Sequence, residues 1–173
     1  PEDATLARDL ARLEDVRRAR AEAAAAYFRA NAPRWDEIRT LHVDDAEVER
    51  TLLDMLPRQG IGDLLDIGTG TGRMLELFAG RVQRAVGIDM SREMLAVARA
   101  NLDKAGRRNC LVRQGDMYQL PLPDQSFDAV IVHQVLHYAD EPAEAIEEAA
   151  RVLKPGGRLV VVDFAPHDLE NLR

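Results

Sequence analysis

The residues best suited to hold a ligand are a carboxylate and three glycines that follow one another within one short segment. The segment reads Asp66, Ile67, Gly68, Thr69, Gly70, Thr71, Gly72 and Arg73. Glycine has no side chain, so the backbone can turn sharply at these positions and a ligand can lie directly against it. A helical pattern begins where the segment ends, and the first N–H groups of a helix are unpaired and lie at its positive end. The pattern predicts a loop that binds a nucleotide-like cofactor.

The glycine spacing distinguishes this loop from two other nucleotide-binding loops. A dinucleotide-binding G-x-G-x-x-G motif that starts at Gly68 would place its third glycine at Arg73, whereas the third glycine is Gly72. No lysine that could grip a phosphate follows, which argues against a P-loop. The form D-x-G-x-G-x-G resembles the first motif of class I S-adenosylmethionine (SAM) dependent methyltransferases, whose ligand carries no phosphate.

Two further carboxylates stand where this resemblance requires them. Asp89 ends a second apolar run, roughly 20 residues past the loop, where an acid can accept hydrogen bonds from both ribose hydroxyls of a cofactor. Asp116 follows a third apolar run, 110–113. The resemblance implies that Asp116 accepts a hydrogen bond from the exocyclic amine of adenine, while Met117 packs on the ring.

The residues after the fourth apolar run, 127–133, are candidates for the chemical step. Ligands of such sheets lie beyond the carboxyl ends of the strands where the strand order reverses, which places His133 and Gln134 beside the sulfonium. His133 could be the base or a donor that orients the methyl acceptor, because imidazole changes its charge near neutral pH. It could instead cap the strand and contact the methionyl part of SAM. His137 and Tyr138 are expected to pack or to lie at the rim of the site, with contact to the substrate as the alternative.

The resemblance implies that SAM is the cofactor. A fifth feature of the family, a helix end and turn before another apolar strand, lies at 153–159, so the family's features follow one another in order. The implied cofactor-binding residues are Asp66, Gly68, Thr69, Gly70, Gly72, Asp89, Met90, Gly115, Asp116, Met117, His133, Gln134 and Tyr27. His133 is also the catalytic candidate.

A catalytic metal is not expected. His133 and His137 are four residues apart, but a zinc-protease motif needs Glu directly after its first His, and Gln134 stands there. Cys110 is the single cysteine and is predicted to be a buried thiol in a strand. Arsenic(III) is normally held by several thiolates, so an arsenic substrate is not expected either.

The first 57 residues predict a helical leader or lid. Leu6, Leu10, Leu13 and Val16 recur at helical spacing in a stretch rich in Ala, Arg and Glu, which predicts a long amphipathic helix over residues 4–30. This helix either lies on the domain or serves as a connector or dimerisation helix. A second helix is expected from about Asp45 to Leu56.

Aromatic residues in the leader also match the family. Tyr27, Phe28 and Trp35, followed by Asp36, are similar to an element that precedes the first motif in small-molecule methyltransferases, where its aromatic residue closes over SAM. Isolated aromatic side chains in a polar helix favour burial. They are therefore expected to form part of a lid, with packing into the core as the alternative.

From Leu64 onward, apolar strands alternate with helices, which predicts an α/β fold with right-handed crossovers. The resemblance specifies a Rossmann-like, doubly wound parallel sheet over residues 58–173, with residues 57–63 as the loop into the first strand. The family adds two strands after the fifth, the last one antiparallel, and the sequence ends before either. The fifth strand, 158–163, has the β-branched pattern of a strand that is covered on both faces and paired on both edges, so an open edge is expected to associate.

Composition limits the partners. A net charge of −7 and a pI near 5.1 argue against direct binding of nucleic acid by this segment. No apolar run is long enough to span a bilayer and no signal peptide is visible, and the single cysteine fits a reduced, cytoplasmic setting. The expected partner is a small-molecule acceptor, with a homodimer through the leading helix or the fifth-strand edge as a further option.

Three stretches resemble a narrower group within the family. Residues 41–43, 133–138 and 162–170 are similar to the methyltransferase half of bacterial proteins in which an ArsR-type winged helix precedes such a domain. The resemblance implies a SAM-dependent methyltransferase of a small molecule within an ArsR-type transcriptional regulator. The alternative is a module that senses SAM or its product S-adenosylhomocysteine (SAH) without turnover.

Overall fold

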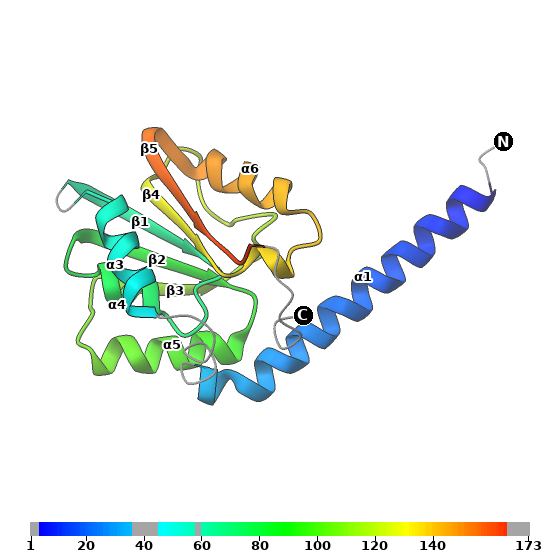
Figure 1. The fold of residues 1–173 in the computed structure, drawn as a ribbon, viewed down its shortest axis with the longest axis horizontal. Coiled ribbons are helices and arrows are strands. Elements are labelled where there is room, and N and C mark those ends of the chain that lie inside the picture. Colours follow the sequence, from blue (N-terminus) through cyan, green and yellow to red (C-terminus); the bar gives the residue numbers. More distant parts are fainter. Residues whose placement is uncertain (1–3, 36–44, 58–59, 166–173) are drawn as a thin grey trace.

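The computed structural model describes residues 4–35, 45–57 and 60–165, and its centre is a parallel five-stranded sheet (Figure 1). The strands are β1 (Ile61–Ile67), β2 (Val82–Asp89), β3 (Cys110–Gln114), β4 (Phe127–His133) and β5 (Leu153–Val162). Their order in the sheet is β3-β2-β1-β4-β5. The direction of winding reverses between β1 and β4, so the carboxyl ends of these two strands form the switch point at which ligands of such sheets bind. The predicted Rossmann-like α/β fold is confirmed.

Helices cover both faces of the sheet. One face packs against α3 (Asp45–Met55), α4 (Arg73–Phe78) and α5 (Arg92–Lys104), and the other packs against α6 (Pro142–Val152). Leu64 and Leu65 show why β1 is a continuous apolar run. Both are fully buried, but they belong to the hydrophobic clusters on opposite faces. A strand buried on both faces needs apolar side chains at successive positions.

Two strands begin earlier than the apolar runs predict. β1 begins at Ile61 instead of Leu64, and Ile61 pairs with Val82, the first residue of β2. β5 begins at Leu153, which pairs with Phe127 of β4. Ladder hydrogen bonds use the backbone, so pairing extends through residues that are not apolar.

The connection between β3 and β4 also departs from the predicted alternation. Residues 115–126 contain no helix, and within them Asp116 and Gln119 form an isolated bridge. The Leu120 side chain of this connection is buried, and its N–H donates to the Glu148 carboxylate on α6 at 2.9 Å. This loop therefore covers part of the sheet face that a helix was expected to cover.

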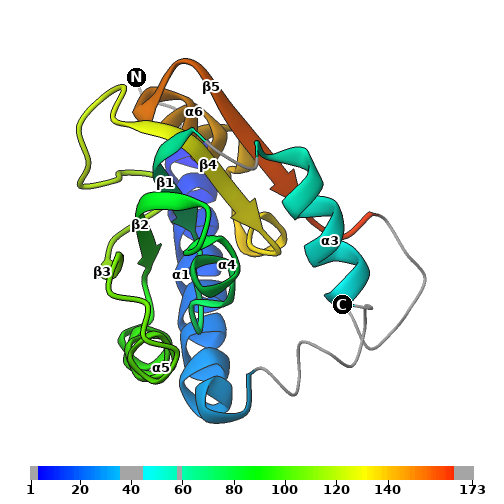
Figure 2. The same ribbon diagram turned by 90° about the vertical axis from the view of Figure 1, so that its left-hand side faces the viewer.

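The leader contains α1 (Ala4–Asn31) and the short helix η1 (Ala32–Arg34) before α3. The helix expected over 4–30 is present, and Figures 1 and 2 show its C-terminal part beside α5. Figure 1 shows its N-terminal part extending away from the sheet. Its apolar stripe is not covered in the described structure. Leu6, Leu10, Leu13 and Val16 are each 45 to 58% exposed. The division into a leader and a SAM-binding domain stays a prediction.

The fifth strand lies at one edge of the sheet. Its single neighbour among the described residues is β4, and Val160 is its one buried residue there. Burial on both faces, as its β-branched pattern predicts, is therefore not found in this part of the chain. Asp36 and the stretches 41–43 and 166–170, which carried parts of the family resemblance, lie outside the described residues.

Candidate functional site

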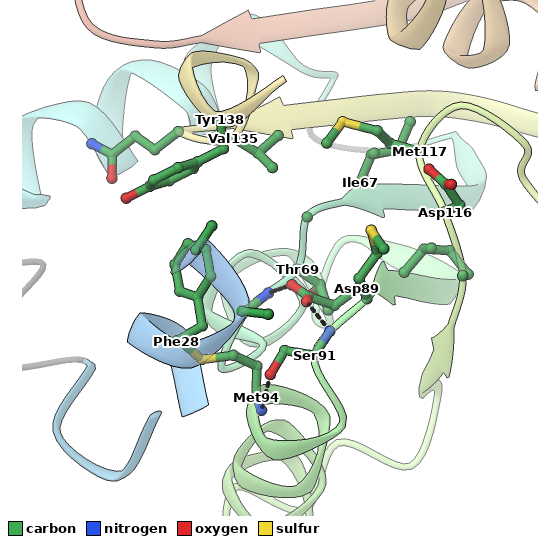
Figure 3. Close-up of a pocket in the computed structure, with 18 of the residues that line it drawn as sticks. Phe28, Ile67, Thr69, Asp89, Ser91, Met94, Asp116, Met117, Val135 and Tyr138 are labelled. Atoms are coloured by element: carbon green, nitrogen blue, oxygen red, sulfur yellow. Dashed lines mark hydrogen bonds between the residues drawn. The ribbon is translucent and has the colours of Figure 1, made fainter. Parts of the chain in front are cut away.

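A cavity of about 890 Å³ lies at the carboxyl ends of β1, β2 and β4 (Figure 3). Its wall combines strand ends, the glycine-rich loop and the C-terminal part of α1. Most of the residues implied as cofactor contacts line it: Asp66, Gly68, Thr69, Gly70, Asp89, Met90, Gly115, Asp116, Met117, His133 and Gln134. Two do not line it, Gly72 and Tyr27.

The three glycines of the loop have different surroundings, although all have positive φ. A Cβ atom on Gly68 would lie 2.5 Å from Cγ2 of Val135, and one on Gly72 would lie 3.2 Å from Cβ of Ala98 on α5. At Gly70 the nearest atom would be Nε1 of Trp35, 3.8 Å away. Gly70 therefore borders open space, whereas Gly72 allows close packing against α5, and its predicted contact with the cofactor stays a prediction.

Asp89, the last residue of β2, ties the loop to the sheet. Its Oδ2 accepts a hydrogen bond from the Gly70 N–H at 2.8 Å, and its Oδ1 accepts one from the Ser91 N–H at 2.8 Å (Figure 3). Burial raises the pKa of Asp89, although these backbone donors act in the opposite direction. Each carboxylate oxygen has two lone pairs, so both can accept a further hydrogen bond from a ligand.

Asp66 is the most unusual carboxylate of the cavity. Its side chain is 1% exposed, and neither oxygen has a hydrogen-bond partner among the described residues. Burial raises its pKa to about 7; the nearby Thr69 hydroxyl, which does not reach hydrogen-bond geometry, offsets part of this rise, and Asp89 adds to it. A buried carboxylate without a partner is costly. A ligand that brings a positive group would supply the missing partner.

Figure 3 shows Asp116 and Met117 at the end of the cavity opposite to Phe28 and Tyr138. Oδ1 of Asp116 accepts a hydrogen bond from the Tyr118 N–H at 2.9 Å, which fixes the carboxylate. The Gly115 N–H donates to the carbonyl of Asp89 at 3.1 Å, so the loops after β2 and β3 are joined beside the cavity.

At the end of the cavity opposite to Asp116 and Met117, aromatic rings from distant parts of the chain close the cavity. Phe28 of α1 lies edge-on to Trp35 and to Tyr138, with ring centroids 5.3 and 4.9 Å apart. Phe28, Trp35 and Tyr138 all line the cavity. Tyr27 contacts Phe28 and Trp35 from outside and is 46% exposed, so the leader presents Phe28 and not Tyr27 to the cavity.

Two ion pairs attach α1 on either side of this aromatic group. Arg29 lies 3.7 Å from the Glu93 carboxylate on α5, and Arg17 pairs with Glu141 at the start of α6. Exposed ion pairs of this kind contribute little stability each. Their positions nevertheless match a helix that crosses one side of the cavity.

The segment after β4 brings two histidines to the cavity. His133 is the last residue of β4, and Gln134 follows with φ +53° and donates its N–H to the carbonyl of Val162 at 2.7 Å. Nδ1 of His137 lies 2.7 Å from Oδ1 of Asp163, directly after β5. From the sequence, His137 was expected to pack, to lie at the rim or to touch the substrate, and Asp163 was not selected as a site residue. The sequence does hold a signal for Asp163, because this carboxylate directly follows an apolar strand. Adjacent parallel strands bring their carboxyl ends together.

Within residues 4–35, 45–57 and 60–165, no group of three or more His, Cys, Asp or Glu residues is placed to hold a metal ion. No helix in the same ranges is both long and apolar enough to cross a membrane.

The proteins that this chain resembles agree with the cofactor site that the geometry indicates. A family model described as a methyltransferase domain matches residues 65–161. Methyltransferase YcgJ of Bacillus subtilis is 39% identical over 106 residues, which cover 61% of this chain and 42% of that protein. Its crystal structure matches with a TM-score of 0.67 and 33% identity, over 71% of this chain and 53% of that chain.

Two further relatives carry more specific names. A demethylmenaquinone methyltransferase of Thermus thermophilus is 37% identical over 145 residues, covering 80% of this chain and 64% of that protein. A phosphatidylethanolamine N-methyltransferase of Cereibacter sphaeroides is 38% identical over 108 residues, covering 62% and 53%. The chain spans about half the length of the curated relatives that it matches. Because the family model covers more than half of the chain and the fold matches the crystal structure of a related methyltransferase, the chain belongs to the class I SAM-dependent methyltransferases.

Proposed function

We propose that this chain binds SAM in the cavity and transfers its methyl group to a small-molecule acceptor. The observation that carries the proposal is Asp66, a fully buried carboxylate that lacks a hydrogen-bond partner among the described residues and borders the cavity beside the glycine-rich loop. SAM contains an ammonium group, a sulfonium, two ribose hydroxyls and an adenine amine. The carboxylates of the cavity fit these groups in kind.

Each carboxylate has a proposed partner on the cofactor. Asp66 would face the positive methionyl end, and Asp89 would accept from the ribose hydroxyls through the lone pairs that its backbone donors leave. Asp116 would accept from the adenine amine, with Met117 against the ring. The open space beside Gly70 lets the ligand approach the backbone. When bound, SAM supplies an electrophilic methyl group on sulfur.

The chain contributes position and exclusion of water. Holding an acceptor in line with a reactive group accounts for a large part of the rate in such bimolecular reactions. The rings of Phe28, Trp35 and Tyr138 cover the end of the cavity that the adenine-side residues leave open. We propose that this aromatic group and α1 form the lid over the bound cofactor and acceptor.

Calorimetric titration with SAM and with SAH, followed by an assay for SAH release, tests the proposal. The acceptor panel includes a reduced naphthohydroquinone and catechol as hydroxyl acceptors, and ethanolamine and vesicles containing phosphatidylethanolamine as amine acceptors. Binding of SAM with release of SAH is the expected result. Tight binding with no release for any acceptor would favour the sensing module. Absence of SAM binding would contradict both functions.

The relation to ArsR-type regulators, the cytoplasmic location and the homodimer also remain part of this proposal. The relation to ArsR-type regulators is supported by the similarity of residues 133–138 to the methyltransferase half of such proteins. The cytoplasmic location is supported by Cys110, a buried cysteine without a disulfide. The dimer is supported by the exposed stripe on α1 and by the edge position of β5. Sedimentation velocity over a range of concentrations would detect a dimer.

A further inference from the structure

We propose that His137 is the catalytic base of the methyl transfer, that Asp163 is its positioning residue, and that the acceptor is therefore a small molecule that reacts through a hydroxyl group. This inference rests on the proposed function and names its acceptor class. It is carried by a contact between residues that lie 26 positions apart in the sequence, at the ends of two adjacent strands.

The carboxylate of Asp163 is held in one orientation by the backbone. Its Oδ2 accepts hydrogen bonds from the N–H groups of Leu136 and His137, at 2.8 and 3.3 Å, and its Oδ1 accepts from the Phe164 N–H at 2.8 Å. Burial alone would raise the pKa of Asp163, but the Phe164 N–H, the His137 ring and the Leu136 N–H together lower it below its ordinary value. The group is thus an ionised acceptor fixed against the imidazole.

An ionised acceptor at 2.7 Å from Nδ1 determines the tautomer of His137. The hydrogen of the neutral imidazole is placed on Nδ1, and the lone pair is left on Nε2. Tyr138 and Phe164 hold the ring from two sides, with centroids 3.9 and 5.2 Å from that of His137. Because His137 also lines the cavity, it is a base with a fixed tautomer at the place where an acceptor would bind. This carboxylate contact, together with the place of His137 at the cavity, is the reason to assign the base to His137.

The proton and electron balance of the step is simple. The acceptor hydroxyl gives its proton to Nε2 of His137, and an oxygen lone pair forms the new O–CH₃ bond. The S–CH₃ bond breaks and its electron pair stays on sulfur, which leaves neutral SAH. Asp163 then faces an imidazolium, whose positive charge it stabilises, and the extra proton passes to water after the product leaves.

The need for a base points to the acceptor class. A neutral amine attacks through a lone pair that is already available, whereas a neutral hydroxyl is a weak nucleophile until its proton is removed. Further charged or titratable side chains that line this end of the cavity include Arg20, Tyr138 and Asp140. None of these is held by a carboxylate contact such as the one between Asp163 and His137 in the described structure.

The test compares His137→Gln, His137→Ala and Asp163→Asn with the unchanged chain, using naphthohydroquinone and catechol against ethanolamine and phosphatidylethanolamine vesicles. Asp103→Asn, an exposed carboxylate on α5, is the matched control. We expect turnover of a hydroxyl acceptor, a loss in kcat of at least about 100-fold in His137→Gln, and at least about tenfold in Asp163→Asn, with SAM affinity unchanged within about twofold. Added imidazole should restore part of the rate in His137→Ala.

Three results would overturn the inference: a kcat in His137→Gln equal to that of the unchanged chain, turnover of amine acceptors alone, or no turnover of either hydroxyl acceptor by a chain that binds SAM. The rescue by imidazole separates a base from a residue that only supports the fold. Failure of the unchanged chain to bind SAM would instead count against the proposed function, so the two failures can be told apart.

Discussion

The two ends of the cavity are built in different ways. At the cofactor end, the glycine-rich loop and Asp89 belong to the consecutive strands β1 and β2, and backbone hydrogen bonds join them: the Gly70 N–H to Asp89, and the Gly68 N–H to the Ile88 carbonyl at 2.8 Å. At the acceptor end, side chains from α1, η2 (Leu136–Tyr138) and the residues after β5 meet through rings and through the contact between His137 and Asp163. Backbone geometry makes the first end rigid, whereas the second depends on how distant elements pack.

The largest effect is expected from Gly68→Ala, at the rigid end. The residue has φ +73°, and its new Cβ would lie 2.5 Å from Val135. Left-handed backbone strain and overpacking together should destabilise the fold by about 3 kcal/mol and lower SAM affinity by at least about 100-fold. Gly80→Ala is the control, because a Cβ there meets nothing within 4 Å. Urea unfolding and calorimetry measure both effects, and equal behaviour of the two variants would show that the loop is not tightly packed.

The same contrast explains what the sequence could predict. The loop, Asp89 and Asp116 are recognisable because each stands at the end of an apolar strand or within two residues of it, so a local pattern determines the contact. The partnership of His137 with Asp163, and the choice of Phe28 over Tyr27 as the ring facing the cavity, depend on the packing of elements far apart in the chain. Spacing alone also cannot distinguish a glycine beside open space, such as Gly70, from one that lies against Ala98, such as Gly72.

Asp89→Ala should have the next largest effect on binding. The change removes the acceptor of the Gly70 and Ser91 N–H groups and the proposed partner of the ribose hydroxyls. Hydrogen bonds to a charged group contribute about 1.5–3 kcal/mol each, so SAM affinity should fall at least tenfold. Asp103→Ala, which removes an exposed carboxylate, should leave it unchanged. Wild-type affinity in calorimetry of Asp89→Ala would refute the assignment of the cofactor end.

Asp66 gives this end a pH dependence. Its pKa rises from 3.8 in the unfolded chain to about 7 in the fold, because the buried carboxylate resists ionisation. The folded state is therefore most stable near pH 4 and below, and it loses stability as the pH rises towards 7. Asp66→Asn removes the charge, and the variant without ligand should be more stable than the unchanged chain at pH 8 by at least about 1 kcal/mol. The difference should vanish towards pH 4 in urea unfolding.

Without a ligand the fold favours the neutral form of Asp66, whereas bound SAM should favour the ionised form. SAM affinity of the unchanged chain is expected to increase as the pH rises through 7, because the ionised carboxylate is the form that pairs with a positive group. Asp66→Asn should bind SAM more weakly and lose this dependence. A variant that binds SAM as tightly as the unchanged chain at pH 8 would remove the reason for placing the methionyl end at Asp66.

A smaller change is expected at the aromatic end. Phe28→Ala removes the ring that meets both Trp35 and Tyr138, and pairs of this kind contribute about 0.5–1.5 kcal/mol. SAM affinity should therefore fall by about two- to tenfold. Tyr27→Ala is the matched control, since Tyr27 belongs to the same ring cluster but does not line the cavity. Equal losses in the two variants would mean that the rings only anchor α1 and do not cover the cavity.

The smallest effect on stability is expected at the far end of α1. Leu10 is 52% exposed, and its helix extends away from the sheet at this point (Figure 1). Leu10→Gln exchanges one good helix former for another and uncovers no core, so the free energy of unfolding of the monomer should change by less than about 0.5 kcal/mol. Because the stripe that contains Leu10 is one of the two surfaces proposed for a dimer, urea unfolding is repeated at several protein concentrations. A loss of more than about 1 kcal/mol that grows with protein concentration would show that a second copy covers the stripe. A loss of the same size that is independent of concentration would show that α1 packs on its own chain more extensively than its exposure indicates.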